Sequence, residues 1–185
     1  MVFAYPRMFA SSATLDAIRL EIGPLALWTP STMAEVMPYV AERHPEVFDA
    51  PSTSVRTAIP ERTLWEKATI LHQEANRPEA KAMPRRYSRH YYDMYRLGRS
   101  DIADRAIARP ELLAKVVAFK EKFYRTPWSR LADARPGTIK LVPPGYRVPE
   151  LQRDYSSMRS MIFGEVPPFE DVLAFMGQLE DKING

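Results

Sequence analysis

The sequence contains no cysteine, which excludes a disulfide framework and any metal site built from thiolates. Its three histidines, His44, His72 and His90, lie far apart and do not have the spacing of zinc ligands. No apolar run approaches the length of a membrane-spanning helix, and the first residues, MVFAYP, lack the basic start and the cleavage pattern of a signal peptide. We therefore expect a cytoplasmic protein that does not enter a membrane.

Several familiar catalytic motifs are also missing. The sequence has no glycine-rich phosphate loop, no dinucleotide fingerprint, no serine nucleophile elbow and no HExxH motif. The enzyme classes that depend on these motifs are thereby excluded, and any chemistry has to come from side chains that no short motif marks.

What the chain does have is a basic segment. The net charge of 185 residues is only +3, but the stretch from Arg77 to Arg99 is strongly cationic, opposed only by Glu79 and Asp93. Its cations are Arg77, Lys81, Arg85, Arg86, Arg89, Arg96 and Arg99. Such a patch suits the phosphates of a nucleotide or an RNA.

The chain divides into an N-terminal β region, residues 1–59, and a helical domain, residues 60–185. The β region contains three candidate strands, VFAYP, the alternating LDAIRLEIG, and SVRTAI before Pro60. Ser31 or Thr32 could cap a short helix that runs through Val40, although Pro38 would strain it. So few strands resemble the end of a sheet rather than a complete one. Together with the long helical domain, they predict the fold class α+β, mostly α.

The helical domain begins with two helices of particular interest, Pro60–Asn76 and Tyr87–Gly98, with Gly98 as a C-cap. Apolar residues recur at helical spacing in the first of them, from Leu64 to Ala75. The later helices are expected at Asp101–Arg109, Glu111–Arg125, Glu150–Phe163 and Pro168–Ile183, and the segments 77–86 and 126–149 are expected as loops.

Two side chains on these helices have both an ordinary and a functional interpretation. Lys67 lies at the flank of the apolar stripe, where it could cover apolar surface with its stem or present a cation to a site. Asp93 lies on an arginine-rich face with Arg89 and Arg96, and Arg89 is four residues away and can pair with it. In the functional interpretation the arginines bind phosphate, and Asp93 binds a metal ion or accepts a proton.

Glu21 is a third candidate. It lies in an otherwise apolar strand, just before the turn Gly23-Pro24, on the same side as Arg19. Either this face is exposed to water, or the carboxylate is displayed on the sheet for a metal ion, which would need further oxygen ligands.

Four segments, in order, resemble the nucleotidyltransferase AbiEii/AbiGii toxin family. They read IRLEIGPLALWTP, PYVAE, IPERTLWEKATILHQEANRP and YSRHYYDMYRL, and they cover about residues 15–97. The elements EKATILH and RHYYD are the specific ones. The resemblance implies the remnant of a polymerase-β-type sheet followed by a helical bundle.

The resemblance also implies an activity. A nucleotide would pass from a nucleoside triphosphate to an acceptor, with Mg²⁺, and tRNA is a known class of acceptor. The protein would be a toxin of a type IV toxin–antitoxin or abortive-infection system and would have a cognate antitoxin. Glu21 matches the strand carboxylate, Lys67 the lysine expected to contact triphosphate, and Arg89 with Asp93 the element expected to orient that site. Glu21 and Asp93 would be the metal ligands, and His90 stands where relatives often have aspartate.

One departure affects the expected activity. The family begins with a Gly-Ser turn that is followed by an Asp-x-Asp pair, and this sequence contains neither. The chain looks as if it starts partway through the catalytic sheet, and we expect transfer to be impaired, because charge neutralisation dominates such reactions. The alternative function is a non-catalytic module that binds RNA or protein through the basic helix 85–99.

Overall fold

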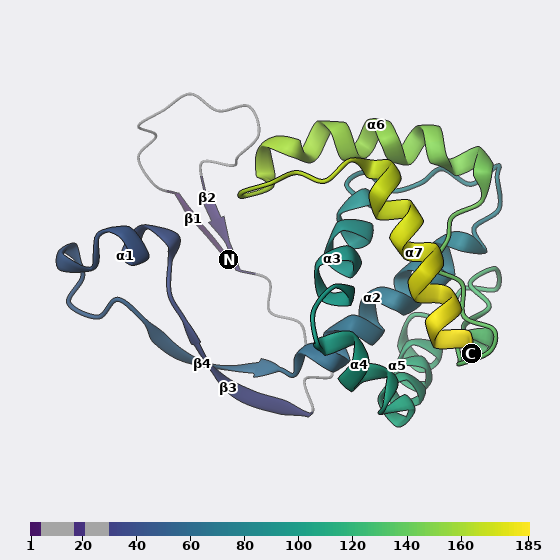
Figure 1. The fold of residues 1–185 in the computed structure, drawn as a ribbon, viewed down its shortest axis with the longest axis horizontal. Coiled ribbons are helices and arrows are strands. Elements are labelled where there is room, and N and C mark those ends of the chain that lie inside the picture. Colours follow the sequence, from purple (N-terminus) through teal and green to yellow (C-terminus); the bar gives the residue numbers. More distant parts are fainter. Residues whose placement is uncertain (5–16, 21–29) are drawn as a thin grey trace.

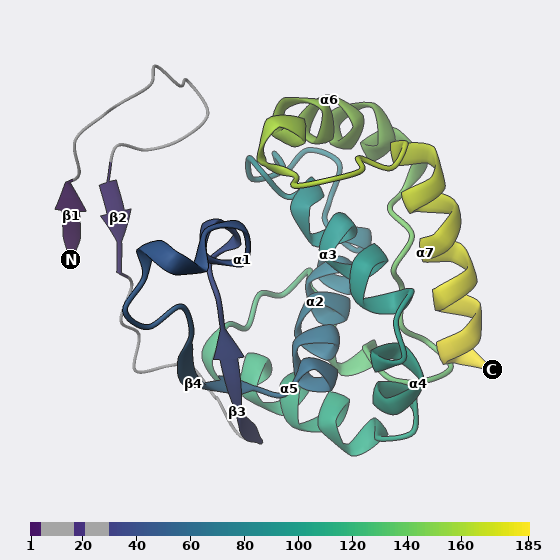
Figure 2. The ribbon, with the colours of Figure 1, turned by 60° about the vertical axis from the view of Figure 1, so that its left-hand side comes forward.

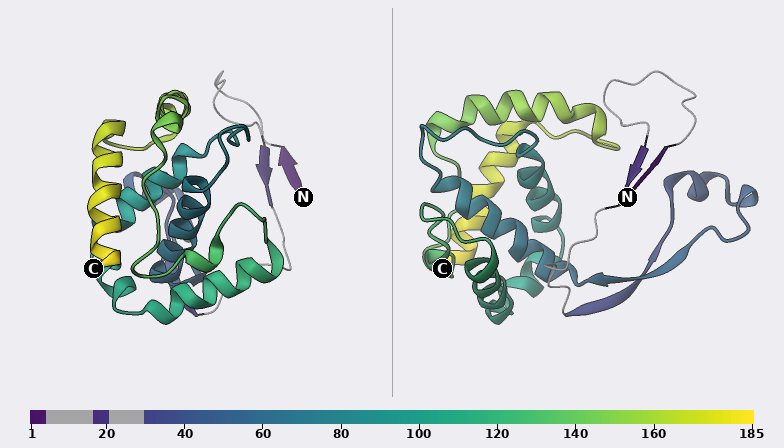
Figure 3. Two further views of the ribbon diagram at one scale, coloured as in Figure 1. Left: turned by 90° about the vertical axis from the view of Figure 1, so that its right-hand side faces the viewer. Right: turned by 180° about the vertical axis from the view of Figure 1, so that it is seen from behind.

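The structure is a computed structural model, and it describes residues 1–4, 17–20 and 30–185. Two antiparallel sheets of two strands each come first. β1 (Val2–Ala4) pairs with β2 (Ala17–Arg19), and β3 (Ser31–Val36) pairs with β4 (Thr53–Ala58) in a register that runs from Ser31 opposite Ala58 to Val36 opposite Thr53. The β3–β4 hairpin extends from the N-terminal end of α2 along one side of the helices (Figures 1 and 3).

The prediction for residues 31–40 was wrong. Ser31–Val36 is not a capped helix but strand β3, because each of its residues pairs with one in β4. A helix does form next, but only after Pro38, which occupies the N-cap position of α1 (Tyr39–Arg43). A proline is tolerated before a helix and disfavoured inside one. The turn η1 (Pro45–Val47) then leads the chain back to β4.

The rest of the chain is helical, and α2 (Pro60–Ala75) lies at its centre. Pro60 occupies the first helical turn, as the sequence predicts. The helix packs against α3 (Ser88–Gly98), α4 (Ile102–Ile107) and α5 (Pro110–Phe123), an arrangement that Figure 2 shows from the side. The chain ends with α6 (Val148–Met158) and α7 (Phe169–Asn184).

The core explains why α2 has this central position. Its predicted apolar stripe is buried among apolar side chains of α3, α5 and α7. Members of this cluster include Leu64, Ala68, Leu71, Tyr91, Met94, Leu113, Val116, Val172 and Met176. Three short 3₁₀ turns, η2 (Leu131–Asp133), η3 (Gly145–Arg147) and η4 (Arg159–Met161), connect the later helices.

The α+β, mostly α fold class is confirmed. All of the strands in the described ranges precede Pro60 and the long helices follow it, but the division of the chain into domains 1–59 and 60–185 stays a prediction. None of the helices within the described ranges combines the length and the apolar character that crossing a bilayer requires.

Gly98 serves packing rather than capping. It is the last residue of α3, and Arg99 takes the C-cap position. A Cβ atom on Gly98 would lie 2.6 Å from Cε1 of Phe175, so the missing side chain is what lets α7 approach α3 this closely.

Two charged side chains from later in the chain fix the start of α3 and the loop before it. Asp154, on α6, accepts hydrogen bonds from the backbone N–H of Arg86 at 2.7 Å and of Ser88 at 2.9 Å, and from the Ser88 hydroxyl at 2.6 Å. Burial raises the pKa of the Asp154 carboxyl, but these hydrogen bonds outweigh it and lower the pKa. The carboxylate therefore caps α3 from a neighbouring helix.

Arg147 is the second of these groups. Its guanidinium is buried, and Nη2 donates to the backbone oxygens of Pro78 at 2.7 Å, Glu79 at 3.2 Å and Lys81 at 2.6 Å. Nη1 donates to Glu150 at 3.0 Å. One side chain therefore holds the loop that connects α2 to α3.

Candidate functional site

A groove runs between α2, α3 and the tip of the β3–β4 hairpin. Its volume is about 610 Å³, within the usual range for small-molecule sites. Its charged lining residues are Lys67 from α2 and Asp93 and Arg96 from α3. Its aromatic and apolar lining residues are Tyr39, Tyr92, Leu97, Met161, Ile162 and Phe163, and Thr63 completes it.

Lys67 and Asp93 meet in this groove. The Lys67 Nζ donates to Asp93 Oδ2 at 2.7 Å, and it also lies 3.4 Å from Nδ1 of His90. The side chain of Lys67 is 24% exposed and that of Asp93 37% exposed, so both remain accessible to a ligand. Two helices, held together by the core, thus place one cation and one carboxylate at the same spot.

His90 is held in its neutral form. Burial, followed by the charges of Lys67 and Arg89, lowers its pKa to about 4. A neutral ring whose Nδ1 carries no proton can accept a hydrogen bond from the Lys67 ammonium. His90 and Asp93 therefore act together as acceptors that orient Lys67.

This shift predicts a loss of stability in acid. The folded pKa of His90 lies below the ordinary value of 6.5, so the unfolded chain binds more protons as the pH falls through 6.5. We expect the free energy of unfolding to decrease between pH 6.5 and 4, by about 3 kcal/mol from His90 alone. Urea unfolding at several pH values measures this decrease.

The control for this prediction is His90→Gln, which keeps an acceptor but does not titrate. Between pH 6.5 and 4, its free energy of unfolding should fall by about 3 kcal/mol less than that of the wild type. Equal slopes for the two proteins would contradict the assignment to His90. His72, whose pKa is lowered by burial, accounts for part of the remaining slope.

His72 is a structural residue. Its Nδ1 accepts from the backbone N–H of Lys140 at 3.0 Å, which leaves Nε2 to donate to the Arg130 carbonyl at 2.9 Å. Both nitrogens are used, so His72 is not available as a general base.

Lys120 is a cation that the sequence analysis missed. It projects from α5, and its Nζ donates to the backbone oxygen of Glu66 at 3.1 Å. Burial lowers its pKa to about 8, with a further contribution from Lys67. The signal was available, because Lys120 lies four residues after the buried Val116 and continues the buried face of that helix.

The arginines do not behave as the i, i+4 spacing suggested. Asp93 pairs across helices with Lys67, and within the described ranges no ion pair joins it to Arg89. Arg96 lines the groove, whereas Arg89 is exposed outside its lining. Glu21 lies outside the described residues, so its predicted place beside Lys67 and Asp93 stays a prediction.

The described residues do not form a magnesium site. Among them no group of three or more His, Cys, Asp or Glu side chains is placed to hold a metal ion, and Asp93 is the only acid that lines the groove. Its carboxylate is also engaged by Lys67. A divalent ion would need oxygen ligands from elsewhere, and we derive no chemical step from one.

Aromatic side chains form a further part of the groove that the sequence did not reveal. Tyr39, from α1, and Phe163, after η4, are stacked with ring centroids 4.4 Å apart and an interplanar angle of 12°. The two rings are 62% and 65% exposed. They lie 124 positions apart in the sequence, and no local pattern could have paired them.

Comparison with known proteins identifies the family. Residues 1–175 match the family model described as nucleotidyl transferase AbiEii toxin, type IV TA system. No curated protein and no solved structure matches the chain. The match extends over both candidate helices and nearly the whole sequence, and nucleotidyltransferases generally use a divalent metal ion. The chain therefore belongs to the AbiEii nucleotidyl transferase toxin family of type IV toxin–antitoxin systems.

Proposed function

We propose that this toxin-family protein binds a nucleoside triphosphate in the Lys67 groove and transfers a nucleotide to an RNA acceptor of the tRNA type. The observation that carries the proposal is the convergence of Lys67 and Asp93, from two helices, in one groove that also contains Arg96. An ammonium and a guanidinium are the groups that bind polyphosphate oxygens best.

The remaining lining residues suit the rest of the nucleotide. The stacked rings of Tyr39 and Phe163 offer an exposed aromatic face against which a base can stack. Polyphosphate would then lie against Lys67 and Arg96, and the base against the aromatic pair. A groove lined by two cations and by an exposed aromatic pair supports a nucleotide more than it supports inorganic phosphate.

The reaction is an in-line displacement at the α-phosphorus. A hydroxyl oxygen of the acceptor forms a bond to this phosphorus, and the bond to the bridging oxygen breaks, so that pyrophosphate leaves with the bonding electrons. The hydroxyl proton passes to Asp93, the carboxylate that lines the groove. Lys67 and Arg96 stabilise the charge that develops on the phosphate oxygens.

The finer parts of this proposal follow from the family. Mg²⁺ is the proposed cofactor, with Glu21 and Asp93 as proposed ligands, and a cognate antitoxin is the proposed partner. Nucleoside triphosphates and tRNA are cytoplasmic molecules, so we place the activity in the cytoplasm. These 185 residues contain no Gly-Ser turn and no Asp-x-Asp pair, and we therefore expect weak transfer and a clearer signal from nucleotide binding.

The test is to incubate the protein with each nucleoside triphosphate labelled at the α-phosphate, with Mg²⁺ and total tRNA. We expect saturable nucleotide binding by titration calorimetry and label on the tRNA that EDTA abolishes. Asp93→Ala should abolish the label. If no nucleotide binds and no label appears, this chain is not a nucleotidyltransferase.

The second candidate function is the non-catalytic RNA-binding module. It is favoured by Arg89, which is exposed and, in the described part of the chain, makes no ion pair. In that case Arg89→Ala and Arg96→Ala would weaken RNA retention uniformly across sequences, retention would fall steeply with salt, and Lys67→Met would change nothing. The response to Lys67→Met therefore distinguishes the two functions.

A further inference from the structure

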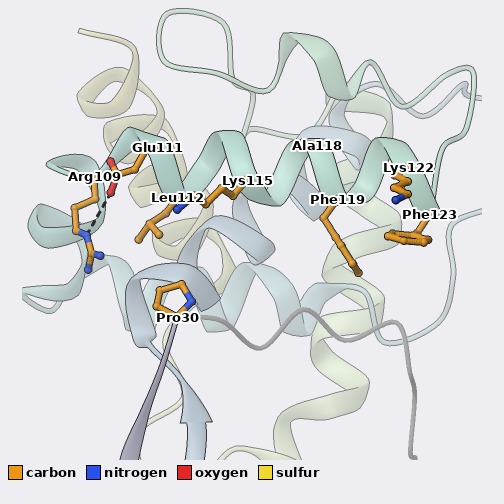
Figure 4. A pocket seen from close by; sticks show the side chains of 9 residues that line it. All are labelled: Pro30, Arg109, Glu111, Leu112, Lys115, Ala118, Phe119, Lys122 and Phe123. Carbon is orange, nitrogen blue, oxygen red and sulfur yellow. Dashed lines mark ion pairs between the residues drawn. The ribbon is translucent and has the colours of Figure 1, made fainter.

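The outer face of α5 differs in composition from its inner face. Leu113 and Val116 point into the core. The outer face carries Lys115, Phe119 and Lys122 at spacings of four and three residues, which places them along one side of the helix. Figure 4 shows these side chains in a row beneath α5.

This face borders a second groove. Its volume is about 680 Å³, and it lies between α5 and Pro30, at the start of β3. Arg109 and Leu112 lie towards one end, and Phe119 and Phe123 towards the other (Figure 4).

Positive charge predominates along the groove. Among the described residues that line it, the cations are Arg109, Lys115 and Lys122 and the one acid is Glu111, whose carboxylate lies 3.5 Å from the Arg109 side chain. Lys115 makes no ion pair or hydrogen bond within the described residues and is exposed. Within the described residues neither Lys115 nor Lys122 forms an ion pair with a carboxylate, and an anionic ligand would supply the missing negative charge.

The aromatic rings lie beside these cations. Phe119 and Phe123 have ring centroids 4.8 Å apart, and the Lys122 ammonium lies 5.1 Å from the centre of the Phe123 ring. Phe123 is 41% exposed. Lysines interleaved with accessible rings are the combination with which proteins hold unpaired nucleic acid, because the lysines follow the phosphates and the rings stack on bases of any identity.

The helix that forms this groove, α5, also contacts α2, the helix that carries Lys67. Lys120, the neighbour of Phe119, donates to the backbone oxygen of Glu66, the neighbour of Lys67. A ligand on the outer face of α5 would thus bind to a helix that packs directly against α2, which lines the groove where we place the nucleotide.

We propose that the groove between α5 and Pro30 binds an unpaired segment of RNA, with phosphates on Lys115 and Lys122 and bases stacked on Phe119 and Phe123. The choice of RNA rather than DNA rests on the proposed function. The assignment of a binding site to this groove rests only on its lysines and aromatic rings. Charge alone would also attract an acidic protein, but two accessible rings beside the lysines favour a ligand that is both anionic and planar.

The probe is a fluorescent single-stranded dodecamer of oligouridylate, measured by anisotropy without nucleotide. The first variant is Lys115→Gln/Lys122→Gln, which changes exposed side chains only. We expect it to weaken binding about tenfold at low salt and to make the slope of log affinity against log salt shallower by about 1.4, which corresponds to two phosphate contacts on a single strand. The matched control, Lys140→Gln, removes an exposed lysine elsewhere and should change neither.

The second variant is Phe119→Leu/Phe123→Leu, which keeps apolar side chains but removes the rings. Binding should weaken about tenfold or more, with the salt slope unchanged. Phe123→Leu alone should give an intermediate loss, and because Phe123 is exposed, this variant is expected to keep the wild-type fold by circular dichroism.

Three results would overturn the inference. They are no binding of the dodecamer at low salt, no effect of the phenylalanine variants, and displacement of the RNA by poly-glutamate at equal charge concentration, which would indicate an acidic protein partner. Calorimetry with nucleoside triphosphate keeps the two proposals apart. If the dodecamer binds and the α5 variants weaken that binding, but no nucleotide binds, the proposed function fails and the α5 site stands. If the nucleotide binds but the dodecamer does not, only the α5 site is removed.

Discussion

Lys67→Met is expected to weaken nucleoside triphosphate binding by about 10- to 100-fold and to lower any transfer by about 100-fold or more. The Lys67 ammonium is aimed into the groove by two acceptors, Asp93 at 2.7 Å and His90 at 3.4 Å. Methionine keeps the length and the apolar stem but removes the charge that would meet the phosphates. Calorimetry and the labelled-tRNA assay measure the two effects.

Inorganic tripolyphosphate makes this prediction specific. Lys67→Met should weaken binding of the nucleotide and of tripolyphosphate alike, because both place phosphates at the ammonium. Phe163→Leu should weaken binding of the nucleotide only, since it removes a ring that tripolyphosphate cannot contact. Lys140→Met, the control, should bind both ligands like the wild type.

The fold of the variant is not expected to suffer. The Lys67–Asp93 pair is partly exposed, and pairs of this kind contribute about 1 kcal/mol or less to stability. Unchanged binding of both ligands by a folded Lys67→Met protein would refute the role of the groove. Loss of tripolyphosphate binding through misfolding would instead appear as a changed circular dichroism spectrum.

The sequence was sufficient for the elements whose signals are local. α2 could be predicted because Pro60 marks its start and its apolar residues repeat at the helical period. The same holds for α3, which forms over Ser88–Gly98 where the sequence predicts a helix from Tyr87 to Gly98. Lys67 and Asp93 could be proposed as candidates for the same reason, as side chains at known positions on these helices.

The partners of these side chains were beyond local reasoning. Spacing alone favours Arg89 as the partner of Asp93. The packing of α2 against α3 brings Lys67 closer, so that Asp93 forms an ion pair with a neighbouring helix and not within its own. β3 was missed because its six residues are stabilised as a strand by pairing with β4. Such tertiary contacts routinely override the secondary-structure preference of a short segment.

Arg147 is the clearest case of a residue whose role no sequence pattern announced. It follows the turn Pro144-Gly145 in a segment expected to be loop, yet its guanidinium is buried and binds three backbone carbonyls of the loop before α3. These carbonyls, at positions 78, 79 and 81, lie 66 to 69 residues earlier in the chain. The position of α3, and hence of Asp93, depends in part on this one cation.

Arg147→Met is therefore expected to lower the free energy of unfolding by about 3 kcal/mol, because it removes the charged hydrogen bonds of a buried guanidinium to three backbone carbonyls and to Glu150. For a chain of this size, this corresponds to a fall in Tm of about 10 °C. Denaturant unfolding and thermal melts measure it, and hydrogen exchange should show faster exchange of the amides of residues 78–82.

Glu150→Gln is the matched control, since it removes the charge that pairs with Arg147 but leaves the guanidinium on the three carbonyls. Glu150 is 38% exposed, so its loss should cost about 1 kcal/mol or less. If Arg147→Met and Glu150→Gln lowered stability equally, the ion pair rather than the carbonyl contacts would carry the effect. If neither changed Tm, the loop before α3 would be held by other contacts, such as those of Arg77 with Glu74 and with the ring of Trp128.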